Sequence, residues 1–216
     1  MAKIVSLEIK TYFIQEGYTD LSKLSFIGFS LGGVVIRAMF PYLKQYHSRF
    51  FFLATFNTPH LGISFSQRSF VEIGLWLLKT VTNKNSSASQ LKLEDKEEYE
   101  DTFIYKLSED PKISHFQYIY LISSESDSYV RKDSAFIFNG EIVKSLSSSK
   151  RKVFQTMISN ILNNINADYV SRIHVPFVDT ESDFDSFIGK KSHISIIGNK
   201  NAIYTIMNSM CSVFEK

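Results

Sequence analysis

The chain contains four short apolar runs, at residues 24–29, 50–56, 116–123 and 168–178. Runs of this length, rich in β-branched and aromatic residues, are typical of strands that are buried on both faces of a sheet. Between them, apolar residues recur at about every third or fourth position, which predicts helices. Strands that alternate with helices indicate an α/β fold with a mostly parallel sheet flanked by helices.

The pattern of apolar and polar residues predicts the helices and the connections between them. We expect helices at residues 4–14, 31–43, 102–107, 153–165 and 202–214, and we expect the first of them to pack on a face of the sheet. Polar or charged stretches predict connections at residues 44–49, 83–89, 94–101 and 145–152. Residues 65–81 are apolar with few charges, and we favour ordinary packing there. The alternative is a cap or lid, within an insertion at about residues 63–110.

Composition narrows the classes of protein. A length of 216 residues, with 44% hydrophobic and 21% charged residues, suits a single globular domain over residues 1–216. A net charge of +2 gives no electrostatic case for binding nucleic acid. The single cysteine, Cys211, rules out an internal disulfide and fits a reducing compartment, so we expect a cytoplasmic protein. Because Cys211 lies in an apolar stretch, we expect it to be a small core residue.

The segment Gly28-Phe29-Ser30-Leu31-Gly32 joins the first strand to the following helix. A Gly-x-Ser-x-Gly sequence between a buried strand and an apolar helix predicts a nucleophile elbow. We expect Gly28 and Gly32 to allow the close approach of strand and helix, since glycine has no Cβ. The turn would expose the Ser30 hydroxyl and place the Leu31 amide at a helix N-terminus, where it can donate to an oxyanion. The alternative is a tight Gly-Ser turn without chemistry.

A base and an acid are expected at the same edge of the sheet as Ser30. Asp127 follows the third predicted strand, and His193 closes the loop after the fourth. The order Ser, Asp, His is that of α/β-hydrolases. Serine needs a base to become a nucleophile, and a carboxylate would orient the imidazole. The rival acids are Asp133 and Asp179, and the rival bases are His60 and His174.

The loop at residues 57–62 follows the second strand, at the edge where parallel sheets place ligands. His60 in this loop would therefore line the site, or it would fix the loop by hydrogen bonding. The fourth strand contains His174, for which we favour a structural role over a catalytic one.

Several segments resemble the eukaryotic putative serine esterase family of lipase-like α/β-hydrolases. They are Ser-Leu-Gly at residues 30–32, Pro-His-Leu-Gly at 59–62, Gly-Leu-Trp at 74–76 and Ser-Tyr-Val directly after Asp127. The resemblance covers most of the chain and implies Ser30 as nucleophile, Asp127 as acid and His193 as base. One departure is Phe29, where many relatives have histidine. We expect contacts with substrate from four residues: Phe29, His60, Leu61 and Trp76.

The resemblance also implies strands upstream of the elbow and a loop with a second oxyanion donor, often His-Gly. Only 29 residues precede Ser30, and the chain has no His-Gly pair. We therefore expect N-terminal strands to be missing and the first strand to lie at a sheet edge. A truncated gene model, a fragment of a longer protein and a degenerate relative would each explain this, and we favour truncation.

The function predicted from the sequence is hydrolysis of carboxylic esters, including lipid esters, through an acyl-enzyme. No metal or organic cofactor is needed. The expected partners are a small-molecule or lipid ester and a peripheral membrane contact. The alternatives are a non-catalytic binding module with the same fold and an acyltransferase with the same triad.

Overall fold

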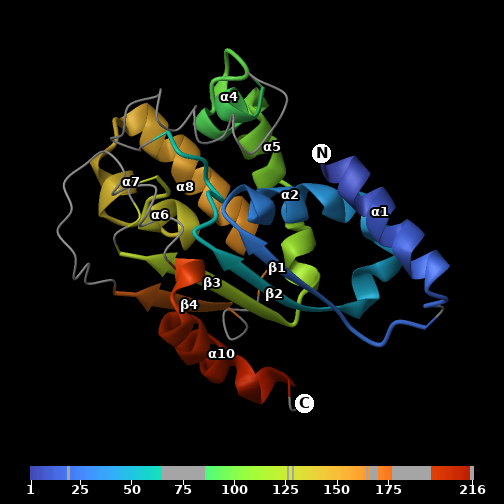
Figure 1. The fold of residues 1–216 in the computed structure, drawn as a ribbon. Coiled ribbons are helices and arrows are strands. Elements are labelled where there is room, and N and C mark those ends of the chain that lie inside the picture. The colour runs from blue at the N-terminus through green and yellow to red at the C-terminus, as the bar shows by residue number, and fades with distance from the viewer. Residues whose placement is uncertain are drawn as a thin grey trace.

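The computed structural model describes residues 1–18, 20–64, 86–125, 127, 129–163, 165, 170–176 and 196–214. Four strands form one sheet in the order β1 (Leu24–Phe29), β2 (Phe50–Phe56), β3 (Tyr118–Ser124) and β4 (Val170–Val175). All neighbouring strands are parallel (Figure 1). Phe29 pairs with Phe56, and Phe56 pairs with Ile122. The carboxyl ends of the strands therefore meet at one edge, and the α/β-hydrolase-like sheet predicted from the sequence is confirmed.

Helices cover both faces of this sheet. Helices α2 (Leu31–Met39) and α8 (Ser148–Leu162) lie over one face, and α10 (Lys200–Phe214) lies over the other (Figure 1). Six short helices lie between β2 and α8 in the described part of the chain: α4 (Ser86–Lys92), η2 (Tyr99–Asp101), α5 (Phe103–Ser108), η3 (Pro111–His115), α6 (Lys132–Ala135) and α7 (Glu141–Ser145). Within the described ranges, no helix is long and apolar enough to cross a membrane.

Two apolar layers hold the helices against the sheet. In β3, Ile119 and Leu121 belong to the layer under α2 and α8, whereas Tyr120 and Ile122 belong to the layer under α10. This alternation follows from the two-residue period of a strand. All seven residues of β2 are buried, as expected for an inner strand that is covered on both faces.

Strand β1 lies at the edge of the four-stranded sheet, as predicted. Its apolar sequence suggests burial, yet Ile27 is 64% exposed and Ser25 is also exposed. An apolar edge strand is a template for pairing with another chain, so this edge is the most aggregation-prone feature among the described strands.

Helix α1 (Ala2–Gln15) does not pack on the sheet, and the expectation that it would is wrong. It contacts α2 and the 3-10 helix η1 (Phe40–Arg49). Its apolar residues occupy two sides of the helix. Ala2, Val5 and Ile9 pack against the core, while four others are exposed: Ile4, Leu7, Tyr12 and Ile14. A helical period alone therefore did not identify the partner of α1.

Some predicted boundaries are also corrected. The helix after the elbow was expected to end near residue 43, but α2 ends at Met39 and η1 follows. Pro41 has no N–H to donate to a helical hydrogen bond, which explains the change. All four predicted connections contain helical residues: η1 covers residues 44–49, and α4, η2 and α8 each overlap one of the others.

Cys211 is exposed, so its expected place in the core is wrong. On α10, the side chains that face the sheet are Ile206, Met210 and Val213, at spacings of three and four. Cys211 follows Met210 by about 100° around the helix and therefore points away from the sheet. Its thiol donates to the carbonyl of Met207 at 3.4 Å.

Candidate active site

Ser30 forms the turn between β1 and α2. It precedes the first residue of α2, with φ 51° and ψ −123°. A residue with a Cβ rarely adopts this conformation, which costs on the order of 1–3 kcal/mol and is found at functional sites. The Ser30 amide donates to the carbonyl of Phe56 at 2.8 Å, which ties the turn to β2. Leu31 begins α2, so its amide is among the open N–H groups at the helix N-terminus.

The close approach at this turn depends on Gly28 and Gly33. A Cβ on Gly28 would lie 2.7 Å from the Gly33 Cα, and a Cβ on Gly33 would lie 2.3 Å from the Thr58 Oγ1. The same atom on Gly32 would meet nothing within 4 Å in the described part of the chain. The sequence motif predicted that Gly32 allows the close approach of strand and helix, and the structure shows that Gly33 does so instead. Successive helical residues point about 100° apart, so only one of the two glycines faces the loop after β2.

A row of hydrogen bonds joins the carboxyl ends of the four strands of the sheet. Next to Phe56, the Asn57 amide donates to the carbonyl of Ile122 at 2.8 Å. The Asn57 Oδ1 accepts the N–H of Ser124 at 2.9 Å, and the Glu125 N–H donates to the carbonyl of Val175 at 3.1 Å. The row extends from the Ser30 turn to the loop that carries Asp127. Sequence reasoning missed Asn57; an asparagine directly after a buried strand is the signal that marks it.

Asp127 follows β3 and is 5% exposed. Its Oδ1 accepts the N–H groups of Tyr129 at 2.9 Å and Val130 at 3.0 Å. These two donors orient the carboxylate and satisfy part of its hydrogen-bonding capacity without a cation. The structure thus places Ser30 and Asp127 at the same edge of the sheet, both in fixed turns.

The carboxylate of the rival acid Asp133 connects two short helices. It lies in α6, and its Oδ2 accepts the N–H of Val143 in α7 at 2.9 Å. Its carboxylate also lies against the backbone at Gly140, where a Cβ would be 2.4 Å from Oδ1. Asp133 therefore joins α6 to α7. The other rival acid, Asp179, lies outside the described residues.

His60 is fully buried, and both of its ring nitrogens have polar neighbours. Arg37 approaches its Nδ1 at 3.4 Å, and the Thr55 Oγ1 lies 3.0 Å from its Nε2. Arginine can only donate, so Nδ1 accepts and the proton is on Nε2, which donates to Thr55. Burial, and secondarily the charge of Arg37, hold the pKa of His60 well below its ordinary value of 6.5. His60 is thus a neutral residue of the interior.

Arg37 holds this part of the interior together. Its guanidinium donates to the carbonyls of His60 and Leu107, each at 3.0 Å. Burial lowers the pKa of Arg37 to about 10, which still leaves the group charged at neutral pH. Arg37 therefore links the nucleophile helix to the loop after β2 and to the end of α5. The spacing of Arg37 and His60 along the chain gives no sign of this contact.

The rival base His174 lies in β4, opposite Ser123 of β3. It lines a cavity of about 380 Å³ together with Asp127 and Glu125. Its Nε2 lies 3.9 Å from the Glu125 carboxylate, and its buried Nδ1 has no partner within the described residues.

Four further predicted site residues complete the account. Leu61 is fully buried, and its N–H donates to the Ser134 Oγ at 3.1 Å. Phe29 packs against the apolar layer under α10. His193 and Trp76 lie outside the described residues, as does the predicted lid segment at residues 65–81. Of the predicted lid region, residues 86–110 contain α4, η2 and α5.

No solved structure was found to match this chain. A protein-family model does match it, over residues 1–137, and the description of that family is "Putative serine esterase (DUF676)". The matched segment includes Ser30 and Asp127 and ends before His193. It spans more than half of the chain and contains the elbow, β1 to β3 and the Asp127 turn. The chain belongs to this serine esterase family.

Proposed function

We propose that this protein is a serine hydrolase that cleaves carboxylic esters, lipid esters among them, through an acyl-enzyme. The observation that carries the proposal is the backbone of Ser30, held at φ 51° directly before α2. In a nucleophile elbow, this strained conformation at the strand-to-helix turn presents the serine hydroxyl beside a helix N-terminus. Membership of the serine esterase family supports hydrolase activity.

In the proposed reaction, the Ser30 Oγ attacks the ester carbonyl carbon while His193 accepts the hydroxyl proton. The Leu31 N–H donates to the resulting oxyanion. When the tetrahedral intermediate collapses, the bond to the alcohol oxygen breaks and His193 returns the proton to that oxygen. Water then attacks the acyl-enzyme by the same route, which releases the carboxylic acid and restores Ser30.

Asp127 is proposed to orient His193 and to stabilise the imidazolium that forms. Its place after β3 supports this role, because β4 pairs with β3 and His193 follows β4 in the chain. The two backbone N–H groups on the Asp127 Oδ1 fix the direction of the carboxylate. A fixed acceptor is what an orienting residue requires.

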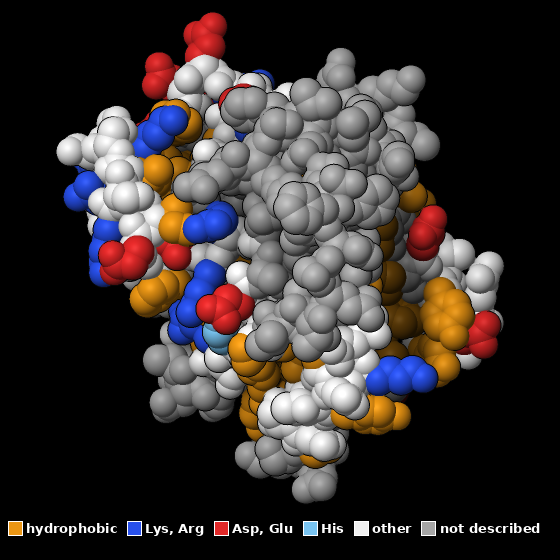
Figure 2. Space-filling view, turned by 60° about the vertical axis from the view of Figure 1, so that its left-hand side comes forward, with side chains coloured by type: hydrophobic (Ala, Val, Ile, Leu, Met, Phe, Trp, Pro, Cys, Tyr) orange, Lys and Arg blue, Asp and Glu red, His pale blue; other side chains and the backbone are white. Residues whose placement is uncertain are grey.

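A peripheral membrane contact is part of the proposal. Phe138, which is 49% exposed, lies beside Arg131 and Lys132 at the cavity that holds Asp127, and an exposed aromatic ring suits contact with a lipid surface. The same cavity is also lined by the carboxylates of Glu125, Asp133 and Glu141, so its charge does not favour anionic head groups. Figure 2 shows basic, acidic and apolar side chains interspersed along its left-hand side.

The experiment that tests the proposal is labelling with a fluorophosphonate probe, which reacts with activated serines. We expect the chain to be labelled and Ser30→Ala to remove the label, whereas Ser25→Ala, in the exposed part of β1, keeps it. Circular dichroism of each variant shows that the fold is retained. A folded protein that takes no label would overturn the proposal and favour a binding module with this fold.

A further inference from the structure

A cavity of about 270 Å³ lies beside the nucleophile helix α2. Its other walls come from the start of α1, from α4 and α5, and from Tyr42 in η1. Most of the lining is apolar, and the polar side chains among the described residues that line it are Lys3, Gln90 and the Tyr42 phenol.

One face of α2 forms the long wall of this cavity. The contributing residues are Leu31, Val34, Val35 and Ala38, at spacings of three, one and three, and Tyr42 continues the same face one turn further. Residues at these spacings share one side of a helix. The wall therefore begins at the residue directly after Ser30 and extends along the helix to Tyr42.

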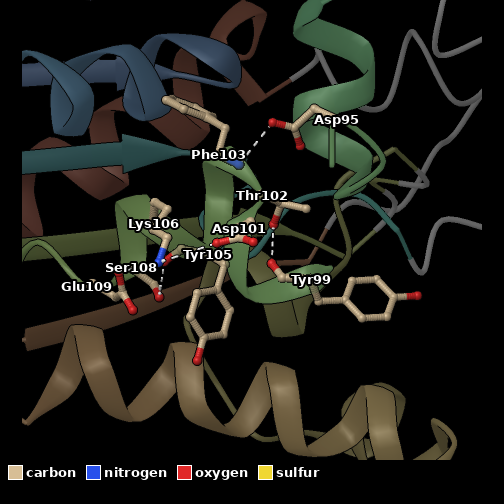
Figure 3. Close-up of polar contacts among 9 residues, drawn as sticks. All are labelled: Asp95, Tyr99, Asp101, Thr102, Phe103, Tyr105, Lys106, Ser108 and Glu109. Atoms are coloured by element: carbon tan, nitrogen blue, oxygen red, sulfur yellow. Dashed lines mark hydrogen bonds and ion pairs between the residues drawn. The ribbon is translucent and has the colours of Figure 1, made fainter. Parts of the chain in front are cut away.

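The opposite wall is held in place by polar contacts. Phe103 lines the cavity, and its N–H donates to the Asp95 Oδ2 at 3.0 Å. Thr102, just before it, donates from its hydroxyl to the carbonyl of Tyr99 at 2.6 Å. Figure 3 shows the Phe103 ring pointing away from α5 on the side opposite to the Tyr105 ring. The Phe103 ring is thus directed into the cavity by an ordered turn.

We propose that this cavity binds the acyl chain of the ester substrate. The inference rests on the proposed function, because the acyl chain of the substrate reaches Leu31 only if Ser30 attacks the acyl carbonyl. Leu31, whose N–H is the proposed oxyanion donor, is also the first residue of the apolar wall. An apolar chain that leaves water for such a cavity gains roughly fourfold in binding for each buried CH₂ group.

The size of the cavity sets the class of acyl group. Pockets for whole drug-sized ligands have about 300–1,000 Å³, so we expect a cavity of about 270 Å³ to take a single acyl chain and not a doubly acylated group. Among the residues of this wall, Ala38 at the end of α2 and Tyr42 in η1 lie farthest along the chain from Ser30. In the proposal they close the end of the cavity and limit the length of the acyl chain. The expected substrates are esters of medium-chain carboxylic acids.

The test is the hydrolysis of p-nitrophenyl esters with acyl chains of two, four, eight, twelve and sixteen carbons. We expect kcat/KM to rise to a maximum at an intermediate length and to fall for the sixteen-carbon ester. Ala38→Leu, which fills the end of the cavity, should lower the ratio of octanoate to acetate hydrolysis by tenfold or more. The matched control is Ala202→Leu, which adds the same atoms beside a different cavity on α10 and should not change the ratio.

A binding measurement separates this inference from the proposed function. Ser30→Ala cannot form an acyl-enzyme, so calorimetric titration of that variant with sodium octanoate reports on the cavity alone. We expect binding, and we expect Ser30→Ala/Ala38→Leu to weaken it by tenfold or more. If fluorophosphonate labelling fails but octanoate binds in this pattern, the catalytic proposal falls and the cavity assignment stands.

Two results would overturn the cavity assignment. One is an absence of octanoate binding to folded Ser30→Ala protein, and the other is an equal octanoate-to-acetate ratio in the parent chain and in Ala38→Leu. If Ala38→Leu does not fold, Val35→Ala replaces it. This change removes two methyl groups from the same wall and enlarges the cavity, so the acyl chain that is hydrolysed best should become longer. An unchanged preference for chain length would again overturn the assignment.

Discussion

The Asn57 side chain joins the ends of β2 and β3 through Ser124: its Oδ1 accepts the Ser124 N–H at 2.9 Å, and its Nδ2 lies 3.4 Å from the Ser124 Oγ. Asn57 follows Phe56, whose carbonyl accepts the Ser30 amide. Ser124 lies just before Asp127 in the chain, and its carbonyl accepts the Asp127 N–H at 3.4 Å. The Asn57 side chain therefore helps to hold the turn of the candidate nucleophile and the loop of the candidate acid in place relative to each other.

Asn57→Gly should disturb this arrangement. The backbone of Asn57 has φ 45°, which glycine tolerates, so the change removes the side-chain contacts without new backbone strain. The buried Ser124 N–H would lose its acceptor, and we expect about 1–3 kcal/mol of lost stability in urea unfolding. We also expect slower fluorophosphonate labelling of Ser30. The matched control is Asn163→Gly, at an exposed position after α8, which should leave the labelling rate unchanged. Equal rates in the two variants would contradict the role of Asn57.

The two glycines after Ser30 give a second prediction. Gly33→Ala places a Cβ 2.3 Å from the Thr58 Oγ1, which forces the loop after β2 away from α2. Overpacking of this kind costs about 1–3 kcal/mol. Gly32→Ala meets no described atom within 4 Å and replaces a poor helix former, so it should be neutral or stabilising by up to about 1 kcal/mol. Thermal unfolding of the two variants checks this, and a larger loss for Gly32→Ala would refute the assignment of the close contact.

These details show where sequence patterns suffice and where they fail. The strands and the elbow could be predicted because continuous apolar runs and a glycine-flanked serine are local signals. The contact of Arg37 with His60 could not, since it joins residues that are far apart in the chain and only the packing of α2 against the β2 loop brings them together. The environment of Cys211 was predicted wrongly because an apolar neighbourhood along the chain does not fix which way a helical side chain points.

His60 should make stability depend on pH. Its pKa in the folded chain is well below 6.5 because of burial and Arg37, whereas in the unfolded chain it is close to 6.5. As the pH falls below about 6.5, only the unfolded chain takes up this proton, so the free energy of unfolding decreases. This contribution is fully present above pH 6.5. The loss approaches about 1.4 kcal/mol per pH unit for one proton.

The difference between the parent chain and His60→Gln isolates this effect. Glutamine keeps hydrogen-bonding groups at the site but does not titrate, so the stability advantage of the parent chain should shrink as the pH falls from 7 to 5. Urea unfolding at several pH values measures it. A constant difference over that range would show that His60 is protonated to the same extent in both states.

A pair of matched substitutions distinguishes the two buried aspartates. Asp127→Asn keeps the size of the side chain but removes the charge that is proposed to stabilise the imidazolium, and comparable changes in a triad lower turnover by about 10⁴-fold. Asp133→Asn keeps an oxygen to accept the Val143 N–H, so it should retain most of the activity. The rate of ester hydrolysis measures both. A larger loss for Asp133→Asn would exchange the proposed roles of the two residues.

The exposed edge at β1 leads to the last prediction. Ile27 is 64% exposed on a strand whose described pairing is with β2 alone, so self-association through this edge should increase with concentration. Ile27→Lys places a charge on the edge, which disfavours edge-to-edge pairing at little cost to an exposed position. Light scattering against concentration should show less association for Ile27→Lys than for the parent chain. The control is Tyr204→Lys, which adds a charge at a 67% exposed position on α10, away from the edge. If Tyr204→Lys reduces association as much as Ile27→Lys does, net charge is responsible and the β1 edge is not the contact.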